Sequence, residues 1–192
     1  MKFNPLMTTP LYPIIEKIVS DEWIKLDREK ITPWVFMTAG APFQIEDYYG
    51  KKILYQGIEF EGGARDVFWN RYIEPFIERV IDFIVNESLR LSEERNQNPK
   101  LMLLEAGCLL KSLVQKVYLR MIEIDRQLRG KGHPHSVPVK NVDGKISAME
   151  QFINRRIDAE VSMVKTKLKV NEIYNKYPFI FWVIPLVISI AS

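Results

Sequence analysis

Both histidines of the chain lie two residues apart in one short stretch, His133-Pro134-His135. Two imidazoles could begin a zinc site, but structural and catalytic zinc sites use three or four ligands. The sequence places no cysteine or further histidine beside them. We therefore interpret both as exposed loop residues and expect no metal. The loop is basic, so contact with lipid headgroups or a phosphate remains an alternative to a solvated loop.

Glu59 and Glu61 alternate along an expected strand and so face the same way. Paired carboxylates are the raw material of glycoside or metal chemistry, but charges on the wet face of a half-buried strand look the same. Gly57, Gly62 and Gly63 are not followed by the Gly-Lys-Ser/Thr of a phosphate loop. No nucleophile elbow, metal-binding helix or paired cysteine motif occurs either. We expect no cofactor, and an enzyme using Glu59 and Glu61 or the histidines is the weakest hypothesis.

The composition is that of an ordinary globular protein, with 192 residues, 47% hydrophobic and 27% charged. A net charge of +3, with basic residues mixed among acidic ones, does not indicate a nucleic-acid partner. Cys108 is the single cysteine, which excludes an intrachain disulfide. Its apolar neighbours predict that Cys108 is a buried small hydrophobic residue.

Two helices in the middle of the chain are expected to form an antiparallel hairpin. Apolar residues recur with a helical period over 66–95, with Trp69, Tyr72, Phe76 and Phe83 as expected core anchors. The second helix, 100–129, carries a seam of apolar residues spaced four, three, four, three and four apart: Leu110, Val114, Val117, Met121, Ile124 and Leu128. This spacing is typical of a face buried against another helix. The short connector predicts an antiparallel arrangement.

The remaining elements complete a mainly α fold with a small N-terminal β element. Residues 1–63 are the least regular region, where Gly50 can supply the left-handed turn of a hairpin. Residues 64–145 hold the helical hairpin and the basic histidine loop, and 146–176 a third long helix that begins amphipathic and ends rich in lysine. Residues 177–192 form a separate hydrophobic segment.

This last segment decides the class of protein. Nine of its residues are Phe, Ile, Leu or Val, which together favour membrane insertion by about 3 to 5 kcal/mol. As a helix, 177–192 would rise about 24 Å, short of the roughly 30 Å hydrocarbon core. The residues expected within the membrane are Phe179, Phe181, Trp182, Ile184, Leu186 and Ile188. Those expected at its interface are Lys165, Lys167, Lys169, Tyr174, Lys176 and Tyr177.

The lysines before the segment predict that the N-terminus stays in the cytoplasm. The leading hypothesis is therefore a non-enzymatic, tail-anchored protein on the cytoplasmic face of a membrane. Its helical domain would bind a protein partner or further copies of itself, and it could act as an effector that perturbs the bilayer. Membrane lipid is a partner in this hypothesis and nucleic acid is not. The alternative is a soluble cytoplasmic regulator or assembly subunit whose C-terminal segment is buried in its own or a partner's core.

Overall fold

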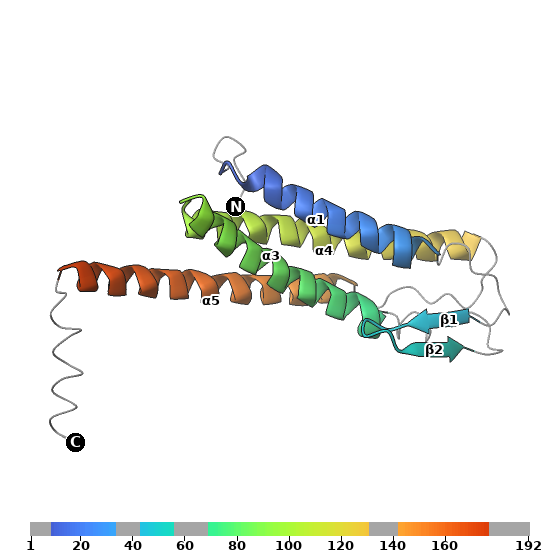
Figure 1. Cartoon of the computed structure of the whole chain (residues 1–192). Helices are drawn as coiled ribbons and strands as arrows, with labels where there is room; N and C mark the ends of the chain where they lie inside the picture. The colour runs from blue at the N-terminus through green and yellow to red at the C-terminus, as the bar shows by residue number, and fades with distance from the viewer. Residues whose placement is uncertain (1–8, 34–42, 56–68, 131–141, 177–192) are drawn as a thin grey trace, which may run out of the picture.

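A computed structural model describes residues 9–33, 43–55, 69–130 and 142–176 (Figure 1). The chain forms helix α1, the π-helix η2, strands β1 and β2, the π-helix η4 and helices α3, α4 and α5. Their bounds are α1 Tyr12–Leu26, η2 Asp27–Ile31, β1 Phe43–Glu46, β2 Lys52–Tyr55, η4 Trp69–Ile73, α3 Glu74–Glu94, α4 Pro99–Gly130 and α5 Val142–Lys176. The prediction of a mainly α fold is confirmed.

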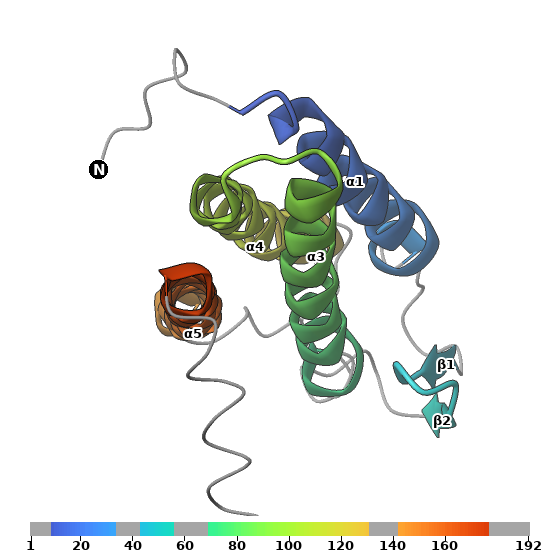
Figure 2. The ribbon, with the colours of Figure 1, turned by 60° about the vertical axis from the view of Figure 1, so that its left-hand side comes forward.

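Helix α4 is the centre of the bundle, because α1, α3 and α5 all pack against it (Figure 2). The turn from α3 into α4 uses Asn96 at a φ of 51°, a left-handed conformation that asparagine tolerates. The side chain of Asn98 accepts a hydrogen bond from the backbone N–H of Lys100 at 3.0 Å. This N-cap starts α4 directly after the turn.

The apolar seam of α4 lies in the core. Leu110, Val114, Val117 and Met121 are fully buried, and Ile124 is 1% exposed. The side chain of Leu128 lies outside the described residues. The N-terminal region adds to this core, because α1 contributes the buried residues Ile15, Val19 and Leu26.

Two sequence-based predictions about burial are wrong. Cys108 is exposed rather than buried, since it falls on a face of α4 that its neighbouring helices leave open. Leu101 and Leu104 lie on the same face and are each 47% exposed. Phe83 is 40% exposed, because it lies between the positions of α3 that point inward, such as Ile81 and Ile84. Helical periodicity identifies a face but not how widely its neighbours cover it.

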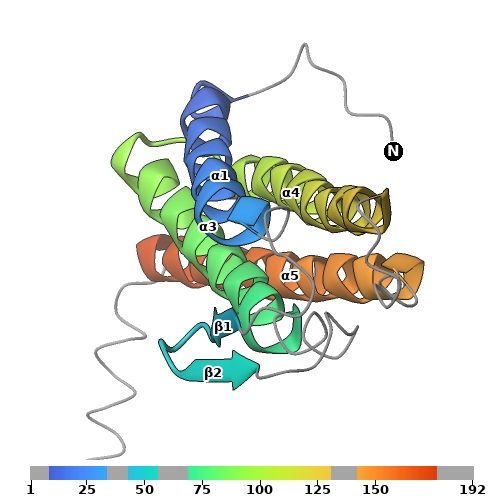
Figure 3. The ribbon, with the colours of Figure 1, turned by 90° about the vertical axis from the view of Figure 1, so that its right-hand side faces the viewer.

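The two strands form an antiparallel hairpin that lies beside the start of α3 (Figure 3). Its register pairs Phe43 with Tyr55 and Glu46 with Lys52, and Gly50 in the turn has a φ of 82°. The backbone N–H of Tyr48 donates to the carbonyl of Arg71 at 2.9 Å. This backbone hydrogen bond and the contact between the rings of Tyr48 and Tyr72 join the turn of the hairpin to η4.

Candidate interaction surfaces

The first half of α5, residues 142–161, is held in the bundle by apolar packing. Ile153 is fully buried and Ile157 is 5% exposed. Gly107 of α4 lies opposite Ile157, and a methyl group at Gly107 would lie 3.5 Å from Ile157 Cγ1. This is an ordinary van der Waals distance, so a methyl group would fit at Gly107, whereas a larger side chain would meet Ile157.

Arg156 fastens the same half of α5 to α3. Its Nε donates to Asp82 Oδ1 at 2.9 Å, a second nitrogen donates to Glu160, and a third lies 3.4 Å from Asn86 Oδ1. The hydrogen bond to Glu160, followed by that to Asp82, raises the pKa of Arg156 above its usual value. Glu160 is only 8% exposed, so Arg156 also neutralises a nearly buried carboxylate.

A polar and aromatic cluster fixes the start of α5. Lys145 Nζ lies 2.6 Å from Glu74 Oε1, which also accepts a hydrogen bond from Trp69 Nε1 at 2.9 Å. The rings of Trp69 and Tyr118 lie 4.3 Å apart. The Tyr118 hydroxyl is buried, without a hydrogen-bond partner among the described residues. Burial, followed by the Glu74 carboxylate, raises the pKa of Tyr118 above its usual value.

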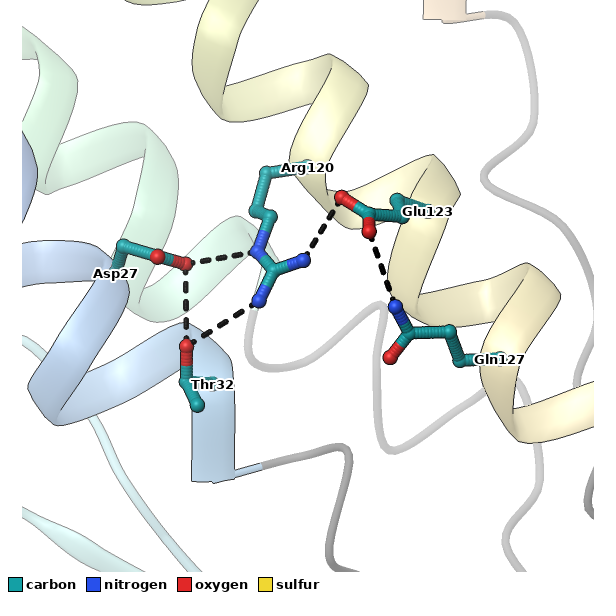
Figure 4. Close-up of polar contacts among 5 residues, drawn as sticks. All are labelled: Asp27, Thr32, Arg120, Glu123 and Gln127. Carbon is teal, nitrogen blue, oxygen red and sulfur yellow. Dashed lines mark hydrogen bonds and ion pairs between the residues drawn. The ribbon is translucent and has the colours of Figure 1, made fainter.

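Both π-helices contact α4 at neighbouring positions, η4 through Trp69 at Tyr118 and η2 through Asp27 at Arg120. Arg120 donates to Asp27 of η2 at 3.0 Å, lies 3.4 Å from the Thr32 hydroxyl and pairs with Glu123 at 2.8 Å (Figure 4). Gln127 donates to the other oxygen of Glu123 at 3.0 Å. This network ties the end of α1 to α4 close to the Trp69–Tyr118 contact. The sequence alone does not predict this network, because Arg120 and Asp27 lie 93 positions apart.

The second half of α5 extends beyond the N-terminal end of α4. Gly107 faces Ile157, and Gln115 donates to Glu150 at 3.1 Å, which fixes α4 and α5 as antiparallel neighbours. Pro99, the first residue of α4, lies eight residues before Gly107. Because the helices are antiparallel, the residue of α5 level with Pro99 lies eight residues after Ile157, at position 165. Residues 166–176 therefore extend about 16 Å beyond the first residue of α4. Figure 1 shows this end of α5 standing clear of the other helices.

We call residues 162–176 the arm. Its described side chains are exposed apart from the half-buried Val164. Three of them are large apolar residues, and Met163, Leu168 and Val170 are 51%, 61% and 45% exposed. The arm thus continues the helix of the bundle without the packing that holds its first half.

The arm also carries the net charge of the protein. Lys165, Lys167, Lys169 and Lys176 are exposed, and Glu172 is the one acidic residue beyond position 162. The chain has 27 basic and 24 acidic residues, so residues 1–162 hold 23 of each. A net charge of +3 therefore belongs to the arm, while the remainder of the chain is balanced.

Several residues singled out in the sequence lie outside the described residues. These are Glu59, Glu61, His133, His135, Tyr177 and the apolar residues Phe179, Phe181, Trp182, Ile184, Leu186 and Ile188; Tyr174 lies in α5, but its side chain is not described. Within the described ranges, no three His, Cys, Asp or Glu side chains gather as metal ligands. No helix in these ranges has the length and apolarity that crossing a membrane requires.

A groove of about 580 Å³ runs between α1 and α4. Its walls include Tyr12 and Trp23 from α1 and Cys108, Ser112 and Lys116 from α4. The exposed Cys108 connects this groove with the open face of α4 that carries Leu101 and Leu104. Groove and face together offer a second surface on which an apolar segment could bind.

Comparison of the chain with protein-family models, with curated proteins and with solved structures found no match.

Proposed function

We propose that the protein is a non-enzymatic helical interaction protein attached to a membrane by residues 177–192. The observation that carries the proposal is the course of α5, which leaves the bundle and ends about 16 Å beyond the start of α4. The charge-free segment thus follows the arm, which extends beyond the first residue of α4. The bundle lies on the cytoplasmic side, because the lysines of the arm precede the segment.

The energetics support attachment by this segment. Its apolar residues favour insertion by about 3 to 5 kcal/mol. The segment is short for a bilayer of about 30 Å, and local thinning of the bilayer accommodates a mismatch of a few ångströms. Pro185 within it is tolerated better in a membrane helix than in a soluble one.

Extraction of the untagged full-length chain from cells tests the attachment. We expect the protein in the membrane fraction, resistant to alkaline carbonate and released by detergent. A variant lacking residues 177–192 should move to the aqueous fraction. The complementary control removes residues 1–8, which leaves the bundle and the segment in place and should not alter the fractionation. Full-length protein that is soluble without detergent would end the proposal.

A second candidate function is a soluble regulator or assembly subunit whose C-terminal segment binds to protein. The open face of α4 favours it, because Leu101 and Leu104 are each 47% exposed beside the groove against α1. In this case, deleting residues 177–192 should lower the cooperativity of urea unfolding. Substituting Leu104→Ser should have the same effect, whereas membrane attachment predicts no dependence of unfolding on the segment.

The segment could also act on the bilayer as well as hold the protein to it. A short apolar helix that packs with copies of itself would span more readily than a single one. Purified protein added to vesicles loaded with a fluorescent dye tests this extension. We expect release of the dye that rises steeply with protein concentration, and intact vesicles at high protein load would remove the effector role.

A further inference from the structure

Lys165, Lys167 and Lys169 of the arm differ from the cations that join one element of the bundle to another. Arg120, Lys145 and Arg156 each pair with a carboxylate on another element, at 3.0, 2.6 and 2.9 Å. Among the described residues, no carboxylate pairs with Lys165, Lys167 or Lys169. Their charges are therefore available to a partner outside the chain.

The positions of these lysines place them along one exposed helix. Lys165 and Lys169 are four residues apart and share a face, and Lys176 follows seven residues after Lys169 on the same side. Leu168, 61% exposed, flanks this face, and Lys167 lies on the opposite face four residues after Met163, which is 51% exposed. Lysines next to exposed apolar residues are typical of helices that bind at the surface of a bilayer.

We propose that the arm is a binding surface for the anionic headgroups of a membrane and acts separately from the apolar segment. The proposal rests on the proposed function, since the segment brings the arm to the bilayer. Charge complementarity supports it, because the arm has a charge of +3 and residues 1–162 are balanced at 23 basic and 23 acidic residues. The field of an anionic leaflet therefore pulls the arm towards the lipid more strongly than residues 1–162, whose net charge is zero.

The expected size of this effect follows from the charges near the surface. Each basic residue within about 10 Å of an anionic surface raises binding roughly fivefold. Removing three lysines should therefore lower binding to anionic vesicles by about a hundredfold. Binding to neutral vesicles depends on the apolar segment and should not change.

The experiment measures flotation of the full-length chain with vesicles of phosphatidylcholine, alone or mixed with phosphatidylserine. The arm variant carries Lys165→Gln, Lys167→Gln and Lys169→Gln. Its matched control carries Lys25→Gln, Lys51→Gln and Lys100→Gln, which removes the same charge from exposed lysines outside the arm. We expect the wild type and the control to prefer anionic vesicles. The arm variant should lose this preference and keep its binding to neutral vesicles.

The preference of the wild type should also fall at about 1 M salt, where the screening length is near 3 Å. Equal binding to both kinds of vesicle by the wild type and the arm variant would overturn the role of the arm and leave the apolar attachment intact. Binding to anionic vesicles alone, lost in the arm variant, would support the arm and remove the apolar attachment. A chain that binds neither vesicle ends both proposals. Binding of single-stranded DNA that depends on these lysines, without a preference for anionic vesicles, would overturn the arm's assignment to lipid.

Discussion

The two halves of α5 are one continuous helix with opposite surroundings. In the first half Ile153 is buried and Arg156 joins Asp82 of α3 at 2.9 Å. In the arm Leu168 is 61% exposed, and the neighbouring Lys167 and Lys169 have no carboxylate partner among the described residues. The difference arises from the lengths of the two antiparallel helices. Helix α4 has its first residue at Pro99, and the arm of α5 extends beyond that residue, where α4 offers no surface to pack against.

An amphipathic pattern gives a helix an apolar surface but does not determine whether another helix covers that surface. Val161, Val164 and Leu168 continue the apolar line of Ile153 and Ile157. Exposure nevertheless rises along this line, from 0% at Ile153 to 61% at Leu168. A stripe that is core in one half is an open surface in the other.

The largest expected difference between the halves is in apolar packing. Ile153→Ala should lower the free energy of unfolding by about 3 kcal/mol, because it leaves a cavity between α4 and α5. The matched change Leu168→Ala in the arm should alter it by less than about 0.5 kcal/mol. Urea denaturation followed by circular dichroism measures both. Equal losses for the two variants would mean that the arm is packed against the bundle.

Removal of a charged side chain should separate the halves less strongly. Arg156→Ala should cost about 1 to 2 kcal/mol, because Glu160 is then left almost buried without its hydrogen-bond donor. Lys169→Ala, the matched change in the arm, should leave the free energy of unfolding unchanged within error. The double variant Arg156→Ala and Glu160→Gln should recover part of the loss. No recovery would show that the Arg156–Glu160 bond is not the origin of the cost.

Tyr118 offers a change of opposite sign near the start of α5. Tyr118→Phe should raise the free energy of unfolding by about 1 kcal/mol, because it removes a buried hydroxyl that has no partner among the described residues. Burial raises the pKa of Tyr118 above its usual value of 10.0. The wild type should therefore lose stability as pH rises above 10, where the unfolded phenol ionises, and the variant should lose less. Chemical denaturation at a series of pH values measures the free energy of unfolding of both proteins. An identical dependence on pH for the two would contradict the burial of the Tyr118 hydroxyl.

The smallest expected effect concerns the approach of α4 and α5. Gly107→Ala should stabilise the protein by about 0.5 kcal/mol, because alanine favours the helix and its methyl would meet Ile157 Cγ1 at an ordinary 3.5 Å. Gly107→Leu should instead destabilise it, since the larger side chain cannot fit beside Ile157. Thermal melting of the two variants tests this. A stable leucine variant would show that α5 can move away from α4.

The helices of this protein could be read from its sequence because their signals are local. The apolar seam from Leu110 to Ile124 repeats within one helix, and the start of α4 at Pro99 is marked by the capping residue Asn98. Even so, α5 begins at Val142 rather than 146. Here Asp143 lies in the first turn, an acidic residue that suits a helix start.

The surfaces could not be read in the same way, because they depend on which helices meet. Cys108 has apolar neighbours in sequence, yet its exposure is decided by the spacing of α1 and α5 around α4. The pairing of Arg156 with Asp82 joins residues 74 positions apart. The exposure of the arm follows from the register between α4 and α5, which no local sequence pattern determines. The sequence alone shows only the lysines of the arm.

The contact between Thr9 and α4 has a consequence for how the chain is made. Glu105 accepts hydrogen bonds of 2.6 Å from both the backbone N–H and the hydroxyl of Thr9, across 96 residues. Helices α3, α4 and α5 are consecutive and can assemble as each leaves the ribosome, whereas α1 emerges first and must wait for α4. During synthesis its apolar face, with Ile15 and Val19, is therefore an exposed site at which a nascent chain would attract a chaperone.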